Sequence, residues 1–172
     1  MLEKYRADAP SQKVRMSLRF CFERPSHMWA TFFGAGAMRP GPGTWGTAAA
    51  ALVFAGYAPF VPFIWQFALG VVAFLLGIWA SEQTGKNIGV KDHGGIVIDR
   101  VAAIWLLFPF LPVRPWAWVV GFVLFRFFDI VKIWPVSWLD KKTQGGFGVM
   151  IDDLFAALYA GIVFFIGMKV LL

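Results

Sequence analysis

The sequence predicts an all-α, polytopic membrane protein, a bundle of four to five apolar helices. The first observation is composition: of 172 residues, 59% are hydrophobic and 15% charged, too few charges to cover a soluble domain of this length. The second is an aromatic content of 18%, which with a mean hydropathy of +0.65 favours a surface that faces lipid. The third is a series of apolar stretches separated by polar or turn-forming segments.

The N-terminal region is basic, and the rest of the chain is predominantly apolar. We expect residues 1–27 to form a basic cytoplasmic segment and residues 28–172 a single membrane-embedded helical domain. Seven of the 16 basic residues precede Gly41, and the segment lacks the apolar run of a signal peptide. The single cysteine, Cys21, excludes an intramolecular disulfide.

The formal net charge of +6 predicts attraction to polyanions, either nucleic acid or anionic lipid. Because the basic residues gather upstream of the apolar part of the chain, the distribution favours an anionic leaflet. We therefore expect a phospholipid partner and no nucleic acid.

Five apolar stretches are bounded by proline, glycine and charged residues, which set their limits. We place them at residues 44–60, 63–80, 96–111, 116–130 and 149–172. Several are near or below the roughly 20 residues that a helical crossing needs, so four crossings remain an alternative to five.

Lysines support one orientation of these stretches. With the N-terminus inside, the loops at 81–95 and 132–147 fall on the cytoplasmic side, whereas the two outside turns carry only Arg114. This is the positive-inside pattern. The lysines of the inside loops are Lys86, Lys91, Lys132, Lys141 and Lys142.

The same topology predicts a cluster of carboxylates. Asp99 begins the third stretch, Asp129 ends the fourth, and Asp152 and Asp153 begin the fifth, so all four lie near the cytoplasmic face. Ionisable groups at this depth are costly and usually pair or line a polar cavity. Because four carboxylates at one level would repel one another, a hard divalent cation such as Mg²⁺ is the natural candidate to join them.

Basic residues and glycine-rich turns near these aspartates suit a phosphate group. Arg126 and Lys132 each lie three residues from Asp129, although Arg126 and Asp129 could simply pair with each other. The turns at 40–47 and 144–148 would expose backbone N–H groups at helix starts, or serve only as turns. His93 is either catalytic or an ordinary solvated or hydrogen-bonded loop residue.

If the protein is a hydrolase, metal-activated water is the expected nucleophile. The sequence contains neither a Gly-x-Ser-x-Gly elbow nor an Asp-x-Asp phosphoaspartate motif.

Four segments in order resemble the signature blocks of the phosphatidylglycerophosphatase A family. They are Pro42-Gly-Thr-Trp-Gly-Thr47, Asp92-His-Gly-Gly-Ile-Val-Ile-Asp99, Phe125-Arg-Phe-Phe-Asp-Ile-Val-Lys132 and Gly145-Gly-Phe-Gly-Val-Met-Ile-Asp-Asp153. The resemblance implies a multi-pass bacterial inner-membrane enzyme with its active site at the cytoplasmic face. It implies Mg²⁺-dependent hydrolysis of phosphatidylglycerophosphate to phosphatidylglycerol and phosphate, a step of glycerophospholipid biosynthesis.

Carried over by position, the resemblance assigns roles to the matched residues. The catalytic residues are expected to be Asp99, Asp129, Asp152 and Asp153, and the metal ligands to be these four with Asp140. The resemblance also implies Lys132 as a phosphate partner. From the charge and turn arguments above, the phosphate is further expected to bind to Arg126, Gly43, Thr44, Gly46 and Thr47.

Two positions depart from the family pattern. Arg100 stands where the family has an acidic residue, directly after Asp99, and Ile133 stands where it tends to have proline. An arginine beside a metal ligand repels the ion or competes for the carboxylate. The alternatives are therefore a catalytically impaired membrane scaffold or, from a different class, a small ion-coupled transporter. The apolar middle and outer halves of the stretches disfavour a transporter, because an ion path needs polar residues through the membrane.

Overall fold

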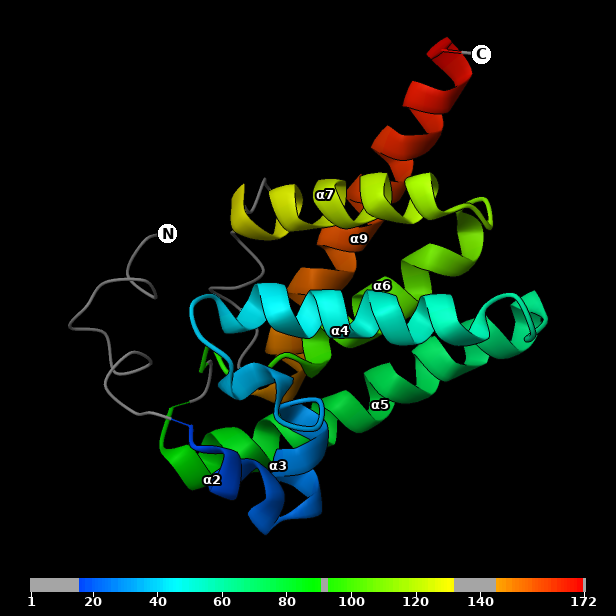
Figure 1. The fold of residues 1–172 in the computed structure, drawn as a ribbon. Coiled ribbons are helices and arrows are strands. Elements are labelled where there is room, and N and C mark those ends of the chain that lie inside the picture. The colour runs from blue at the N-terminus through cyan, green and yellow to red at the C-terminus, as the bar shows by residue number, and fades with distance from the viewer. Residues whose placement is uncertain (1–15, 91–92, 132–144, 172) are drawn as a thin grey trace.

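The computed structural model describes residues 16–90, 93–131 and 145–171, and every regular element in these ranges is a helix (Figure 1). The predicted all-α class is therefore confirmed for this part of the chain. The elements are α2 (Leu18–Glu23), α3 (Pro25–Ala30), η2 (Ala35–Ala37), α4 (Pro42–Tyr57), α5 (Phe63–Ile88), α6 (Ile98–Leu107), η3 (Phe108–Phe110), α7 (Pro115–Val131) and α9 (Gly146–Leu171).

Proline and glycine set several helix boundaries. Pro42 and Pro115 are the first residues of α4 and α7, where the missing N–H of proline removes no hydrogen bond. Gly89 follows α5 with a φ of 77°, a left-handed conformation that glycine adopts without steric strain. Each predicted apolar stretch consequently begins within three residues of an observed helix start.

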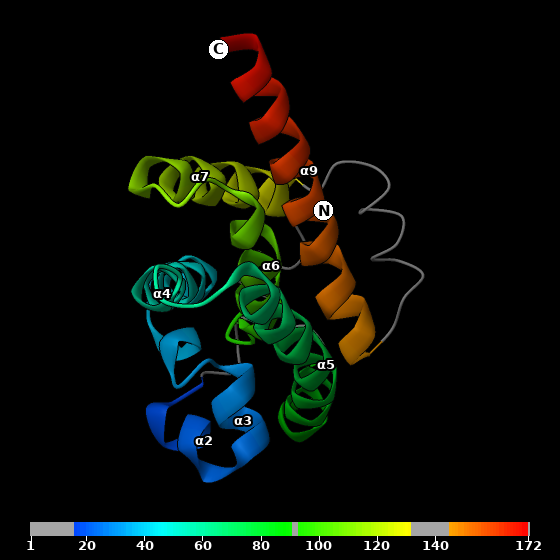
Figure 2. The ribbon, with the colours of Figure 1, turned by 90° about the vertical axis from the view of Figure 1, so that its right-hand side faces the viewer.

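α6 forms the centre of the bundle. It contacts α4, α5 and α9, and nine of its ten residues are buried. Figure 2 shows α6 enclosed by these helices and α7. Trp105 of α6 donates its indole N–H to the Ala50 carbonyl of α4 at 3.0 Å. The charged residues at the start of α6 are therefore held by the packed core.

Small residues allow α5 to approach α6 and α9 closely. The buried face of α5 repeats Gly70, Ala73, Gly77 and Ala80 at spacings of three or four residues. A Cβ atom on Gly77 would lie 2.6 Å from the Met150 side chain of α9, closer than atoms pack. Such small-residue faces are typical of helices that associate without a bulk hydrophobic driving force.

Two of the predicted crossings have helices of membrane length. Within the described residues these are Phe63–Ile88 and Gly146–Val170, judged by length and composition. α6 has ten residues and rises about 15 Å, half of the roughly 30 Å hydrocarbon core of a bilayer. The stretch predicted at 96–111 therefore does not provide a full helical crossing by itself.

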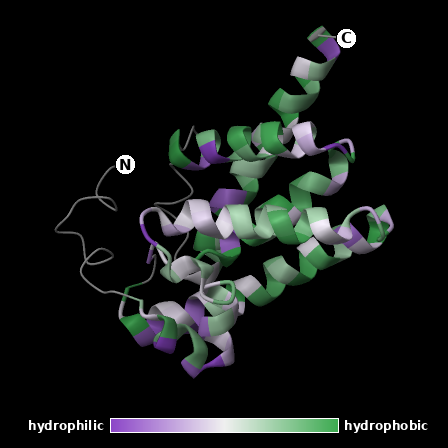
Figure 3. Cartoon of the chain, in the orientation of Figure 1, coloured by the Kyte–Doolittle hydropathy of each residue, from purple (hydrophilic) through white to green (hydrophobic). Residues whose placement is uncertain are grey.

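The outward faces of the helices are strongly apolar. Leu52 is 74% exposed, Trp65 65% and Ile166 59%. Figure 3 shows hydrophobic colouring along much of α5, α7 and α9. Extended exposed apolar surface is uncommon on monomeric soluble proteins and marks contact with lipid or another protein.

The expected boundary between residues 27 and 28 falls inside α3, which packs against α5. Thr84 of α5 donates its hydroxyl to the Ser26 carbonyl at 3.3 Å, and Asn87 lies 2.8 Å from the His27 ring. Cys21 of α2 is buried, and this burial raises the pKa of its thiol. The described part of the N-terminal segment therefore packs on the bundle, while residues 1–15 lie outside the described residues.

Candidate active site

Four of the predicted aspartates lie on three helices that meet at one end of the bundle. Asp99 is in the first turn of α6, Asp129 in the last turn of α7, and Asp152 and Asp153 in the second turn of α9. All four side chains are buried. Because α9 packs against both α6 and α7, the fold brings these carboxylates to one region.

Arg100 lies among the carboxylates. Its Nη1 atom is 2.9 Å from Oδ2 of Asp99. Its Nε atom is 3.3 Å from Oδ2 of Asp129 and 3.8 Å from Oδ2 of Asp153. The arginine side chain is only 6% exposed, and a buried charge requires such compensation. One guanidinium group thus joins acids from α6, α7 and α9.

Gly43, in the first turn of α4, leaves room for this guanidinium. A Cβ atom at position 43 would lie 2.9 Å from Nε of Arg100 and 3.4 Å from its Cδ. The absence of a side chain here therefore allows the start of α4 to approach the charged cluster.

Arg126 connects the cluster to α4. Its guanidinium forms an ion pair with Asp129 one turn further along α7. A second nitrogen, Nη2, donates to the Thr44 hydroxyl at 3.3 Å. The pairing of Arg126 with Asp129, one of two alternatives left open by the sequence, is present, and the same side chain also contacts a residue predicted to bind phosphate.

A cavity of about 520 Å³ adjoins these residues, and we call it the arginine cavity. It is lined by three arginines and by glycines of the segment 36–43 and of the turn 93–95. These two segments are in close contact, since a Cβ atom on Gly36 would overlap the Gly95 carbonyl. The lining residues are Met16, Gly36, Ala37, Arg39, Pro40, Gly41, Pro42, Gly43, His93, Gly94, Gly95, Arg100 and Arg126.

The arginine cavity has the chemistry of an anion site. Guanidinium groups bind phosphate oxygens through charge-assisted, often bidentate hydrogen bonds. Arg39, Arg100 and Arg126 supply three such groups, and buried aspartates hold the latter two in position. A phosphate monoester suits this lining, and the adjacent carboxylates are groups that can accept a proton.

The aspartates suit a magnesium ion by atom type. Carboxylate oxygens are the hard ligands that Mg²⁺ prefers. Within the described residues, no three His, Cys, Asp or Glu side chains are arranged to hold a metal ion, and Arg100 lies between the acids. Arg100 also lines the cavity, so its guanidinium adjoins both the carboxylates and the cavity.

The other predicted phosphate ligands lie elsewhere. Gly46 packs on Val97, and Thr47 donates its hydroxyl to the Gly43 carbonyl at 2.7 Å within α4. Neither residue is part of the cavity lining. Lys132 and Asp140 lie outside the described residues.

Two parts of the cavity were not assigned to phosphate binding from the sequence. Arg39 was counted only among the basic residues of the N-terminal region. His93 is 4% exposed rather than solvated, and its Nδ1 accepts a hydrogen bond from the Gly95 N–H at 3.0 Å. The sequence signal that could have identified both residues is a glycine-rich turn after each: Arg39 precedes residues 40–43, and His93 precedes Gly94 and Gly95.

Comparison with known proteins identifies close relatives. The family model described as phosphatidylglycerophosphatase A matches residues 28–168. The chain is 39% identical to phosphatidylglycerophosphatase A of Haemophilus influenzae over 148 residues, which cover 82% of this chain and 87% of that protein. It is 38% identical to phosphatidylglycerophosphatase A of Escherichia coli strain K12 over 160 residues, 92% of each chain.

A third similar protein carries a different name. It comes from Bacteroides thetaiotaomicron, is provisionally named a phosphatidylinositol-3-phosphatase, and is 35% identical over 150 residues, 80% of this chain and 92% of that protein. No solved structure matches the chain.

Proposed function

Because the chain belongs to the phosphatidylglycerophosphatase A family, we propose that it hydrolyses phosphatidylglycerophosphate to phosphatidylglycerol and phosphate, a step of glycerophospholipid biosynthesis. The observation that carries this proposal is the arginine cavity beside four buried aspartates. Its three guanidinium groups complement a phosphate monoester, and the carboxylates supply proton acceptors at its edge.

The proposed location is the bacterial inner membrane, with several crossings and a cytoplasmic N-terminus. The exposed apolar side chains of the long helices and the two helices of membrane length support embedding. The lysine distribution of the sequence supports the orientation. In this placement, the arginine cavity opens at the level where phospholipid headgroups lie.

Each charged group has a proposed role. Arg39, Arg100 and Arg126 bind the phosphate oxygens and balance the charge that develops as water attacks phosphorus. The bond from phosphorus to the glycerol oxygen breaks, and a water proton reaches that oxygen by way of a carboxylate. Asp129 holds two of these arginines in place. Lys132, predicted as a further phosphate partner, lies outside the described residues.

Magnesium is part of the proposal as a cofactor. Asp99, Asp129, Asp152 and Asp153 are the residues that would hold it, with Asp140 as a further predicted ligand outside the described residues. When bound, the ion supplies positive charge to the phosphate and lowers the pKa of a coordinated water.

A second reading is supported by the same cluster. Arg100 forms ion pairs with Asp99 and Asp129 and lies 3.8 Å from Asp153, so it neutralises carboxylates that the enzyme needs for a metal ion. A protein locked in this arrangement would keep the fold without turnover. This reading is a catalytically impaired membrane scaffold.

One assay separates the two readings. We would measure phosphate release from phosphatidylglycerophosphate, and from phosphatidylinositol 3-phosphate for comparison, with Mg²⁺ and with a chelator. Magnesium-dependent release that Asp129→Asn abolishes supports the phosphatase. Release only from Arg100→Glu identifies an impaired enzyme, whereas no release from either form contradicts the proposal. Preference for the inositol lipid would reassign the substrate.

A further inference from the structure

A second hollow, of about 560 Å³, lies between the N-terminal helices and the outer face of α4. We call it the apolar groove. Every residue that lines it is apolar, aromatic or glycine, in contrast to the charged lining of the arginine cavity. Its lining includes Leu18, Trp29, Phe33, Met38, Trp45 and Ala48.

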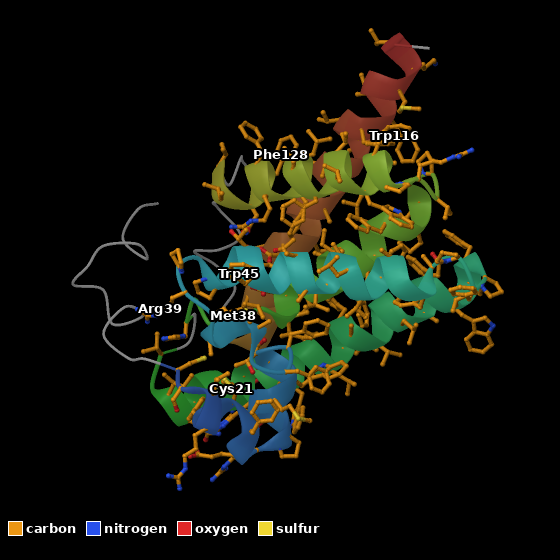
Figure 4. The ribbon with its side chains drawn as sticks, in the orientation of Figure 1. Cys21, Met38, Arg39, Trp45, Trp116 and Phe128 are labelled. Atoms are coloured by element: carbon orange, nitrogen blue, oxygen red, sulfur yellow. The ribbon has the colours of Figure 1, made fainter. Side chains whose placement is uncertain are left out.

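The groove and the arginine cavity share a wall. In the segment after η2, Met38 lines the groove while the next residue, Arg39, lines the cavity. In the first turn of α4, Gly43 lines the cavity and Trp45 lines the groove. Figure 4 shows Met38, Arg39 and Trp45 beside one another near the start of α4. Apolar and cationic surfaces therefore meet along one short piece of chain.

One side of the groove is a turn at Phe32 and Phe33 with a strained backbone. Phe32 and Phe33 have φ values of 45° and 54°, a left-handed conformation that phenylalanine rarely adopts. Phe32 is buried with its ring 5.9 Å from that of Trp105, and the Thr31 hydroxyl accepts the Gly34 N–H at 3.3 Å. These contacts fix the turn and leave Phe33 54% exposed in the groove. Strain maintained in this way is characteristic of binding sites.

We propose that the apolar groove binds an acyl chain of the phospholipid whose phosphate occupies the arginine cavity. This inference rests on the proposed function and identifies which part of the protein holds the lipid tail. A glycerophospholipid joins an anionic phosphate to apolar chains through a short glycerol unit. The shared wall presents cationic and apolar surfaces in the same adjacent order.

The groove differs from the general lipid-facing surface. The outer faces of α5 and α7 are also apolar, but the groove is concave and adjoins the site that carries the arginines. A chain held here would fix the headgroup over the cavity, which converts binding energy of the tail into orientation of the reacting phosphate.

Photo-crosslinking tests the proposal without requiring turnover. The full-length protein in bilayer vesicles would be exposed to phosphatidylglycerophosphate that carries a diazirine within one acyl chain, diluted in unlabelled lipid. We expect adducts on Trp29, Phe33 and Trp45. These should be several-fold more abundant than with phosphatidylcholine bearing the same chain, because only the monoester occupies the arginine cavity.

Groove-filling and control variants sharpen the result. Ala48→Phe, in the groove, should reduce these adducts several-fold, whereas Leu75→Phe, on the outer face of α5, should leave them unchanged. Equal labelling by both headgroups, or adducts mainly outside the groove, would overturn the proposal and indicate general lipid contact.

Phosphate release measured in the same samples distinguishes the two proposals. Enriched adducts without release would support the groove and contradict the phosphatase. Release without enrichment would support the phosphatase and overturn the groove.

Discussion

The arginine cavity and the apolar groove lie on either side of one wall but are built differently. The cavity draws its charges from the segment before α4, from α6 and from α7, so its shape depends on contacts between distant parts of the chain. Apart from Trp105, the groove is formed by residues between Leu18 and Val53. With the proposed roles, the difference teaches that headgroup binding would depend on the packed core, whereas tail binding would depend largely on local structure. Substitutions in the two regions should therefore fail in different ways.

The largest effect is expected where the cavity's charges are buried. Arg100→Met removes the guanidinium that compensates the buried carboxylates of Asp99 and Asp129, and removing one partner of a buried ion pair typically costs about 3 to 5 kcal/mol. The free energy of unfolding, measured by denaturant titration in detergent, should fall by that order. Glu82→Gln is the control, because its pair with Lys86 is exposed and should change stability by at most about 1 kcal/mol. Equal effects would contradict the central role of Arg100.

Removing one of the guanidinium groups proposed to bind phosphate comes next. Arg126→Ala should lower kcat/KM for phosphatidylglycerophosphate by about 100-fold, the usual order for a preorganised group that stabilises developing charge. The loss should be the same for short and long acyl chains. Arg114→Ala, an exposed arginine just before α7, serves as the control. A loss of kcat/KM confined to long-chain substrates would show that Arg126 contributes to acyl-chain binding rather than to phosphate binding.

A smaller and selective effect is expected in the groove. Trp45→Ala removes a large apolar contact and should lower kcat/KM about tenfold for long-chain substrate, which corresponds to about 1.4 kcal/mol. The dihexanoyl analogue should be hydrolysed at nearly the unchanged rate. The measurement is the ratio of kcat/KM for the long-chain substrate to kcat/KM for the dihexanoyl analogue. If Trp45→Ala left this ratio unchanged, the groove would not bind the acyl chain.

The smallest effect concerns the glycine at the wall. Gly43→Ala places a Cβ atom 2.9 Å from Arg100 and should destabilise the protein by about 1 kcal/mol through crowding. Gly56→Ala in the same helix meets no atom within 4 Å and should stabilise it by about 0.5 to 1 kcal/mol. Thermal unfolding of the two variants gives the comparison, and a stabilising Gly43→Ala would show that Arg100 is free to shift.

Sequence reasoning located the helices well because their limits are local. Pro42 and Pro115 act through their own backbone geometry, and the observed helices begin close to the predicted positions. The predicted end at residue 80 was wrong, because α5 continues through the polar residues 81–88 and ends before Gly89. The length of α6 was harder to predict, since an apolar run of buried core residues resembles one that faces lipid. Only the enclosing helices distinguish the two cases.

The site was predicted in part for the same reason. Topology alone placed Asp99, Asp129 and Asp153 at one end of the bundle, and the structure brings them around one arginine. Arg39 and His93 reach the same cavity because the segment that begins at η2 contacts the turn at 93–95, more than fifty residues further along the chain, and no local pattern records this contact. The groove could not be predicted either, because its shape depends on the left-handed backbone conformation of Phe32 and Phe33, which phenylalanine rarely adopts.

Because α6 is short and enclosed, bilayer thickness should affect it less directly than the longer helices. In a bilayer, hydrophobic mismatch acts on the surfaces that touch lipid, and α5 and α9 would respond by tilting. α6 presents almost no surface to its surroundings, so it has little contact through which such a force could act. In the proposed bilayer placement, the buried charges at its first turn would therefore have little direct contact with lipid, whatever its composition.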